Sequence, residues 1–249
     1  MGINENGSGH VPLILAVETS GRLGSVAIAA GNDLLGEKTF SGPMRHSMEL
    51  FPAVKGLLAE FDKKPEQIEH IYISSGPGSF TGLRISMTLA KILHLAQSSV
   101  KIVAVDTLDV IAANAFEFLR KKAADIPAIA AILDAKRGEF FIALYENRDN
   151  QWEKTVEDRL MTATEFLDNF AGRFKKIWLS GEGLVYYKDL FASDVVDFFE
   201  ESCWYPKASK VHLLGWEKAQ KEEFSDVMML EPRYIRRPDI GKKKSSGPF

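Results

Sequence analysis

Apolar residues in the first half of the chain fall into short runs separated by Gly-, Asn- and Asp-rich turns, a pattern typical of strands. The first three runs are close together and predict a β-meander. The apolar residues that follow, among them Leu50, Val54, Leu57 and Phe61, recur at helical spacing and predict an amphipathic helix. Strands and helices then alternate. The predicted strands are 13–17, 24–30, 34–40, 68–74 and 101–105, and the predicted helices are 44–61, 79–97 and 108–121.

The second half repeats this order more loosely. Thr162 and Glu165 have the spacing of a capping box and predict the start of a helix. Two halves that each place a meander before α/β units predict a two-lobed α/β fold of the actin/hexokinase-like (ASKHA, ribonuclease H-like) class, with mixed sheets flanked by helices. The predicted strands here are 126–134, 139–146, 152–160 and 176–180, and the predicted helices are 162–170, 184–191 and 209–223.

This pattern also predicts how the lobes divide the chain. We expect the first lobe to span 13–110, with a closing helix at about 211–223 packing back on it, and a smaller second lobe to span 111–210. The segments 1–12 and 241–249 have no apolar periodicity and are expected to be flexible tails. The lysines of the last segment are typical of a solubilising end, with RNA contact as the alternative.

Composition and charge narrow the class of protein. With 45% hydrophobic and 26% charged residues, the chain is an ordinary globular protein. A formal net charge of −3 does not favour a stand-alone nucleic-acid-binding domain, which would be basic. Cys203 is the only cysteine, which excludes an intramolecular disulfide, and the histidines lack metal-binding spacing. Because no apolar run approaches the ~20 residues of a membrane span, we expect a cytoplasmic protein without membrane contact.

The Gly-rich segment 76–85 joins a predicted strand to a predicted helix, with Ser79 placed to cap that helix. Free N–H groups at such a helix start can bind a phosphate or a carboxylate. The spacing fits neither the dinucleotide-binding pattern nor the P-loop, so a tight turn with unusual backbone angles is the alternative. The residues of this motif loop are Gly76, Pro77, Gly78, Ser79, Thr81, Gly82 and Arg84.

The helix after the motif loop has two apolar faces, whereas a helix that covers one side of a sheet needs only one. Either this helix is enclosed within its own lobe, or one face meets another protein. One face consists of Phe80, Leu83, Met87, Ala90 and His94, and the opposite face consists of Ile85, Leu89, Ile92 and Ala96.

Two turns are candidates for ligand contact. Glu18, Thr19 and Ser20 end the first strand at the turn that holds a nucleotide phosphate in actin-like ATPases, which makes them weak nucleotide-binding candidates. Arg22 makes this turn poorer in glycine than a good phosphate turn. Asp134 ends another strand, where it suits a metal ligand or a base, and a solvated hairpin tip is the alternative.

Taken together, these segments resemble the TsaB family over about 13–236. The most specific match is the string Gly-Pro-Gly-Ser-Phe-Thr-Gly-Leu-Arg at 76–84, which the family shares with its paralogue TsaD. The other matching segments are 14–20, 24–27, 46–52, 90–91, 134–139 and 232–236. The resemblance implies the two-lobed fold described above.

A difference from TsaD indicates which activity to expect. TsaD carries an HxxxH metal motif, and Thr107 and Ile111 stand where its two histidines would be. Neither side chain binds a transition metal as imidazole does. The resemblance therefore implies a non-catalytic subunit required for threonylcarbamoyladenosine modification of the adenosine next to the anticodon of tRNA. The alternatives are an actin-like or sugar-kinase-type ATPase and a glycoprotease-like hydrolase.

The resemblance also implies partners. These are a TsaD-like catalytic subunit, a TsaE-like ATPase and tRNA bound through the complex, with a homodimer as an option for the isolated chain. No cofactor is expected, except ATP or ADP at the interface of the assembled complex. The family pairs with TsaD through helices of the first lobe, which favours Met87 and its neighbours as the partner side because methionine adapts to such surfaces. The expected interface residues are Met44, His46, Leu50, Phe80, Leu83, Met87, Ala90, Lys91 and His94.

Overall fold

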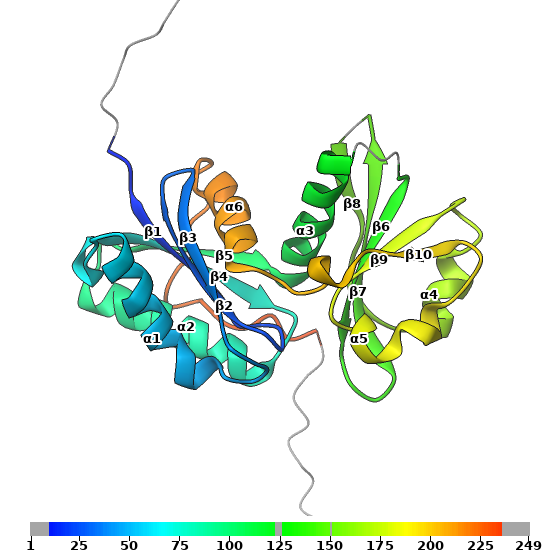
Figure 1. Ribbon diagram of the computed structural model, residues 1–249, viewed down its shortest axis with the longest axis horizontal. Helices are drawn as coiled ribbons and strands as arrows, with labels where there is room; N and C mark the ends of the chain where they lie inside the picture. The colour runs from blue at the N-terminus through cyan, green and yellow to red at the C-terminus, as the bar shows by residue number, and fades with distance from the viewer. Residues whose placement is uncertain (1–9, 123–125, 150, 236–249) are drawn as a thin grey trace, which may run out of the picture.

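The computed structural model describes residues 10–122, 126–149 and 151–235. Two five-stranded mixed sheets stand side by side, each with helices on both faces (Figure 1). The chain completes the first sheet before it enters the second, and one late helix returns to the first sheet. The predicted two-lobed α/β class with mixed sheets flanked by helices is confirmed.

The first sheet has the strand order β3-β2-β1-β4-β5, with β1 antiparallel to β2 and parallel to β4. Both faces of β1 are covered, so all six of its residues are buried. Leu15 and Val17 pack toward α1 and α2, while Ile14 and Ala16 pack toward α6. The elements of this lobe are β1 (Leu13–Glu18), β2 (Ser25–Ala30), β3 (Asp33–Thr39), α1 (His46–Glu60), η1 (Pro65–Gln67), β4 (Ile68–Gly76), α2 (Phe80–Ala96), β5 (Lys101–Asp106) and α6 (Ala208–Ala219).

The second sheet has the strand order β10-β9-β6-β7-β8 and alternates in the same way. Leu133 and Phe141 face α3, whereas Ile132 and Phe140 share a core with α4 and α5. The predicted capping box is confirmed, because Thr162 and Glu165 exchange side-chain-to-backbone hydrogen bonds at the start of α4. The elements are α3 (Thr107–Lys122), β6 (Ala128–Asp134), β7 (Glu139–Arg148), β8 (Gln151–Thr162), α4 (Ala163–Phe170), β9 (Ile177–Ser180), α5 (Leu184–Tyr187), η2 (Lys188–Phe191), β10 (Val196–Phe198) and η3 (Glu201–Cys203).

Three details differ from the sequence-based expectation. The closing helix α6 ends at Ala219 rather than at 223, because Glu222 takes a left-handed backbone angle that a helix does not allow. The predicted helix 184–191 is one α-helical turn followed by a 3-10 turn. The strand β10 was not predicted, since three residues carry no readable periodicity. The expected tail 241–249 and residues 1–9 of the other tail lie outside the described residues.

A segment that follows α6 runs back across the first lobe. Its Leu230 is buried in the same core as Ile85 and Leu89 of α2. The Arg233 N–H donates to the carbonyl of Ser75, which holds the segment beside the motif loop. In the described ranges, none of the helices combines the length and apolarity needed to cross a membrane.

The contact of α6 with the first sheet gives a stability test. Val211 is fully buried there, whereas Leu213 on the same helix is 39% exposed. We expect Val211→Asp to lower the free energy of unfolding by roughly 3 kcal/mol or more, because an unpaired carboxylate would enter the core. Leu213→Asp is the matched control and should change it by about 0.5 kcal/mol or less. Urea denaturation measures both variants, and equal losses would show that α6 has no buried face.

Candidate functional site

The motif loop is fastened to the turn between β1 and β2. The Ser79 side chain accepts from the Gly82 N–H, as its predicted capping role requires. The Ser79 N–H donates to the carbonyl of Ser20 at 2.7 Å. The Thr19 hydroxyl donates to the carbonyl of Gly82 at 2.8 Å. These bonds use polar groups of the loop inside the protein, which favours the interpretation as a tight structural turn.

Two glycines of the loop allow this close approach. A Cβ atom at Gly82 would lie 1.8 Å from the carbonyl oxygen of Thr19, and one at Gly78 would lie 2.5 Å from that of Ser20. Real side chains do not fit at either distance, so glycine is required for packing at both positions. Gly76 has φ of +113° and is followed by a cis peptide bond to Pro77. The unusual backbone angles that the sequence suggested are therefore present.

The weak nucleotide candidates in the β1–β2 turn are mostly turned away from solvent. The Glu18 carboxylate is fully buried, where it accepts from the N–H and hydroxyl of Ser20 at 2.5 Å and from the hydroxyl of Ser74. Burial raises the pKa of Glu18. Thr19 is also buried, whereas Ser20 lines a cavity. This corrects the expectation for Glu18 and Thr19, which hold the turn together from inside.

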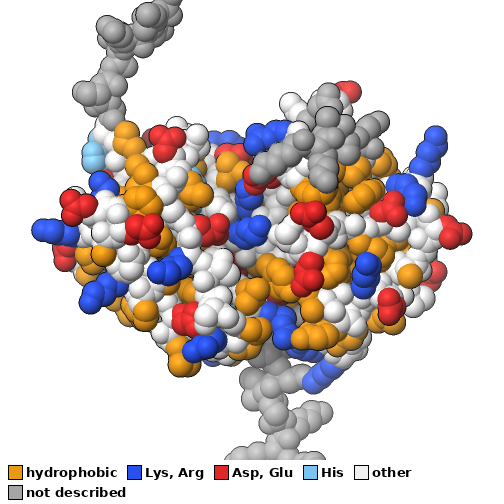
Figure 2. All heavy atoms as spheres, viewed as in Figure 1, with side chains coloured by type: hydrophobic (Ala, Val, Ile, Leu, Met, Phe, Trp, Pro, Cys, Tyr) orange, Lys and Arg blue, Asp and Glu red, His pale blue; other side chains and the backbone are white. Residues whose placement is uncertain are grey.

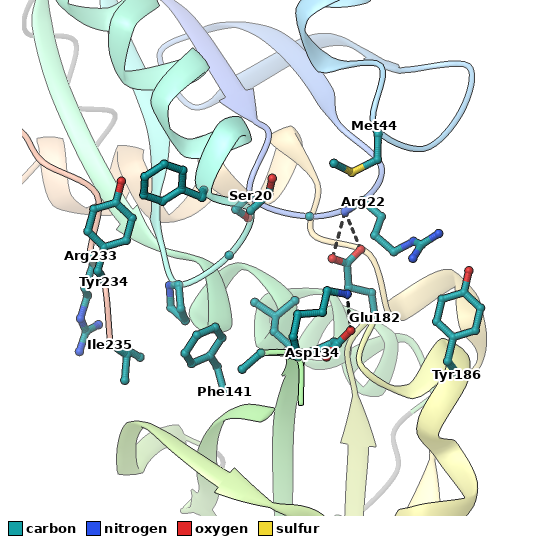
Figure 3. A pocket seen from close by; sticks show the side chains of 18 residues that line it. Ser20, Arg22, Met44, Asp134, Phe141, Glu182, Tyr186, Arg233, Tyr234 and Ile235 are labelled. Atoms are coloured by element: carbon teal, nitrogen blue, oxygen red, sulfur yellow. Dashed lines mark hydrogen bonds and ion pairs between the residues drawn. The ribbon is translucent and has the colours of Figure 1, made fainter. Parts of the chain in front are cut away.

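The cavity that Ser20 lines is a cleft of about 460 Å³ between the two lobes (Figure 3). Its walls combine aromatic rings with charged groups, an arrangement typical of binding sites. The lining residues are Ser20, Gly21, Arg22, Met44, Pro77, Gly78, Ser79 and Phe80 from the first lobe, Leu133, Asp134, Ala135, Lys136, Phe141, Glu182 and Tyr186 from the second, and Arg233, Tyr234 and Ile235.

A carboxylate of the second lobe reaches into the first lobe at this cleft. Both oxygens of Glu182 accept from the backbone N–H of Arg22, at 3.0 and 2.8 Å. Burial raises the pKa of Glu182 to about 7, and the nearby Glu18 carboxylate adds to the effect. Figure 3 shows this contact as dashed lines between the two labelled residues. No local pattern in the sequence links Glu182 to a residue so distant in the chain.

Asp134 was a candidate metal ligand or base in the sequence. It lines the cleft, and its carboxylate pairs with Lys136 of the same hairpin at 2.5 Å. Within the described ranges, no group of three or more His, Cys, Asp or Glu side chains is placed to hold a metal ion. Thr107 and Ile111, at the positions of the TsaD histidines, are both fully buried at the start of α3. Because its carboxylate pairs with Lys136, Asp134 is one half of an ion pair at the cleft wall.

An ionic cluster joins the lobes at a second place. The Arg233 guanidinium donates to Asp106 at 2.6 Å and to Asp158 at 3.0 Å. Asp106 ends the first sheet, whereas Asp158 lies on β8 of the second. Lys154 pairs with the other oxygen of Asp158 at 2.5 Å. Because the Asp158 side chain has no exposed surface, these partners supply the charge compensation that its burial requires.

The predicted interface residues divide into buried and exposed groups. His46, Leu50, Leu83, Met87 and Ala90 are buried within the first lobe and offer no surface to a partner. This corrects the expectation for the Met87 face, which packs on the lobe's own core. The opposite face is also partly covered, since Leu89 is buried and Ile85 is half-buried against the same core as Leu230. Lys91 and His94 are half-buried, while Met44 and Phe80 are exposed.

Other apolar side chains of α1 and α2 are exposed and point away from the core. Phe51 is 61% exposed, and Leu95 is 81% exposed. In Figure 2, hydrophobic side chains reach the surface among charged ones over the region of α1 and α2. Sequence periodicity located the helices but could not tell which stripe the rest of the chain covers. We call this surface the outer helical face, defined by Met48, Phe51, Ile92 and Leu95.

Comparisons with known proteins agree with this architecture. A model of the family described as tRNA N6-adenosine threonylcarbamoyltransferase (TsaD) matches residues 42–243. The tRNA threonylcarbamoyladenosine biosynthesis protein TsaB of Bacillus subtilis (strain 168) is 30% identical over 227 residues, which cover 90% of this chain and 93% of that protein. TsaB of Escherichia coli (strain K12) is 26% identical over 232 residues, or 92% of this chain and 97% of its own. YeaZ from Pseudomonas aeruginosa, a solved structure, has a TM-score of 0.73 at 22% identity and covers 90% of this chain and 99% of its own.

The close approach at Gly82 predicts a large effect from one methyl group. We expect Gly82→Ala to lower the free energy of unfolding by about 1–3 kcal/mol or more, because its Cβ would overlap the Thr19 carbonyl. Gly172→Ala is the matched control, since nothing lies within 4 Å of a Cβ there. Thermal and urea denaturation of both variants provide the measurement. A Gly82→Ala variant as stable as the control would contradict this packing.

Proposed function

Because the chain belongs to the TsaB (YeaZ) family, we propose that it is a tRNA threonylcarbamoyladenosine biosynthesis protein that binds and supports a TsaD-like catalytic subunit. The observation that carries the proposal is the outer helical face. It presents several large apolar side chains on two neighbouring helices of the first lobe, and exposed apolar patches of this kind mark sites of protein–protein interaction.

The residues at the TsaD-like positions support the proposal of a supporting rather than a catalytic role. Thr107 and Ile111 are packed in the core, so no side chain at these positions reaches a substrate. In the cleft, Asp134 is paired with Lys136 and Glu182 is bonded to Arg22. Cys203 is buried, and burial raises the pKa of its thiol, which opposes nucleophilic chemistry. We therefore propose that chemistry resides in the partner subunit.

The outer helical face has the composition of an interface core. Met48 is flexible and adapts to a partner surface, and Phe51 supplies a large rigid anchor. Beside Phe51 lies an apolar groove of about 520 Å³ between α1 and α2, with Leu58 and Leu89 in its walls. Such a groove can receive apolar side chains of a partner helix. Lys55 and Lys63, which also line it, favour a partner with carboxylates beside its apolar residues.

The remaining partners belong to the same proposal. A TsaE-like ATPase and tRNA would join through the assembled complex, which agrees with a net charge of −3 that does not favour RNA binding by this chain alone. Without its partner, the same outer helical face would support a homodimer. ATP or ADP would bind only at the interface of the complex. All of these proposed interactions would take place in the cytoplasm.

A charge in the outer helical face tests the proposed interface. We expect Phe51→Glu to weaken binding of the host's TsaD-like subunit at least about tenfold, because an interface core tolerates a buried carboxylate poorly. Phe51 is 61% exposed, so the isolated variant should melt like the wild type. Leu190→Glu, at a 53% exposed leucine of the second lobe, is the control and should bind normally. Calorimetric titration gives both affinities, and normal binding by Phe51→Glu would refute this interface.

A second substitution separates the core of α2 from its surface. Met87 is 4% exposed, and Met87→Glu should lower the free energy of unfolding by roughly 3 kcal/mol or more because the carboxylate has no partner there. Thr88 next to it is exposed, and Thr88→Glu should leave stability within about 0.5 kcal/mol. Chemical denaturation compares the two. A Met87→Glu variant with unchanged stability would show that Met87 is not part of the core and would make it a candidate for the partner interface again.

A further inference from the structure

The cleft between the lobes gathers most of the exposed aromatic side chains in the part of the chain that the structure describes. These side chains are Phe51, Phe80, Tyr186 and Tyr234. Phe51 lies on the outer helical face, whereas the other three line the cleft. Met44 also lines the cleft and is 63% exposed. Several large apolar side chains left open to water around one hollow are typical of a protein-binding site.

An arginine lies against an aromatic ring at each end of the cleft. The Arg84 guanidinium lies 3.6 Å from the centre of the Phe80 ring and donates through Nε to the Tyr234 hydroxyl at 3.3 Å. The Arg22 guanidinium lies 4.9 Å from the centre of the Tyr186 ring. Figure 3 shows Tyr234 and Tyr186 at opposite ends of the cleft. The cleft therefore presents two separate cations, each held on an aromatic ring.

Neither of these two guanidinium groups has its charge compensated by a carboxylate of the chain. The ion pairs within the described ranges do not include Arg22 or Arg84. The carboxylates that line the cleft are engaged elsewhere, since Asp134 pairs with Lys136 and Glu182 accepts from the backbone N–H of Arg22. Both guanidinium groups can therefore bond carboxylates of another molecule, for which their planar geometry is well suited.

The walls of the cleft are held in place by contacts within the chain. The Met44 N–H donates to the carbonyl of Arg22 at 2.9 Å, which fixes Met44 to the β1–β2 turn. The rings of Tyr234 and Phe80 are stacked with their centres 5.2 Å apart. The next residue, Ile235, packs against a core of the second lobe. A surface that is already ordered loses less conformational entropy when a ligand binds.

We propose that the cleft is a second protein-binding surface, which takes an extended segment of a partner protein with an apolar side chain between acidic residues. The apolar side chain lies against Met44 and Phe141, and the carboxylates bond Arg22 at one end and Arg84 at the other. This inference goes beyond the proposed function. It adds a surface separate from the outer helical face and does not depend on binding of a TsaD-like subunit there.

Two other occupants fit the cleft less well. A phosphate-bearing ligand would use free N–H groups at the start of α2, but those of Ser79 and Gly82 are bonded inside the fold. The end of this chain, 236–249, carries five lysines and arginines and one aspartate, so its charge does not complement two arginines. An acidic segment of another protein matches both the charge and the apolar walls.

Selection from a random heptapeptide library against the full chain provides the test, because it presupposes no sequence. The most enriched peptide is then labelled with a fluorophore, and anisotropy measures its affinity for the wild type, Arg22→Glu, Arg84→Glu and the control Arg120→Glu. Arg120 is exposed on α3 and does not line the cleft. Thermal melts identify any variant that fails to fold, and Arg22→Gln or Arg84→Gln then takes its place. No TsaD-like subunit is present, so failure here leaves the proposed function untouched.

We expect the enriched peptides to place an apolar residue between acidic ones. Arg22→Glu and Arg84→Glu should each weaken binding at least about tenfold, because like charges would then face each other, while Arg120→Glu should bind normally. A peptide with lysines in place of its acidic residues should prefer the double variant of Arg22→Glu and Arg84→Glu over the wild type.

Three results would overturn the proposal. The first is a selection that enriches no peptide, or only peptides without acidic residues. The second is equal binding of the peptide by the wild type and both arginine variants. The third is displacement of the peptide by ADP as effectively as by the unlabelled peptide, which would assign the cleft to a phosphate-bearing ligand.

Discussion

The close contact between the start of α2 and the β1–β2 turn is the constraint on which the rest of the structure depends. Gly78 and Gly82 bring two backbone segments together at distances that exclude any side chain. The bonds of Ser79 to Ser20 and of Thr19 to Gly82 then fix the helix against the first strand. Glycine at these positions is needed for packing, and the N–H groups of Ser79 and Gly82 are bonded inside the fold.

This contact sets the position of two surfaces of the protein at once. On one side, it orients α2 beside α1, so that one stripe of both helices remains exposed as the outer helical face. On the other side, it holds the turn at Arg22 in reach of Glu182 from the second lobe. The carboxylates of Asp134 and Glu182 at the cleft have partners from the chain itself.

Local pattern predicted most of the fold. Runs of apolar residues located nearly all strands and helices, and the caps at Ser79 and Thr162 were identified from residue type and spacing. The motif at 76–84 indicated the TsaB family, which the comparisons confirm. Such features depend on neighbours in the chain, so sequence alone contains them. The three-residue strand β10 and the irregular segment around Leu230 lack any period and were not predicted.

The site was harder to predict because its contacts join distant parts of the chain. Periodicity gave two apolar stripes on α2, but the residues that cover each stripe come from other elements, and Met87 was therefore assigned to the wrong side. Arg22 and Glu182 are 160 positions apart, and no local signal pairs them. Glu18 was a nucleotide candidate from its place at a strand end, whereas only the folded chain shows its carboxylate bonded by Ser20 and Ser74.

Hydrogen–deuterium exchange of the full chain, alone and with the host's TsaD-like subunit, tests the central claim most directly. Amides of α1 and α2 at the outer helical face should exchange more slowly in the complex, because a partner that covers these helices suppresses their local opening. Amides of α4, on the far side of the second lobe, should exchange at the same rate in both samples. Slower exchange confined to the second lobe, with α1 and α2 unchanged, would contradict the proposal that the outer helical face binds the catalytic subunit.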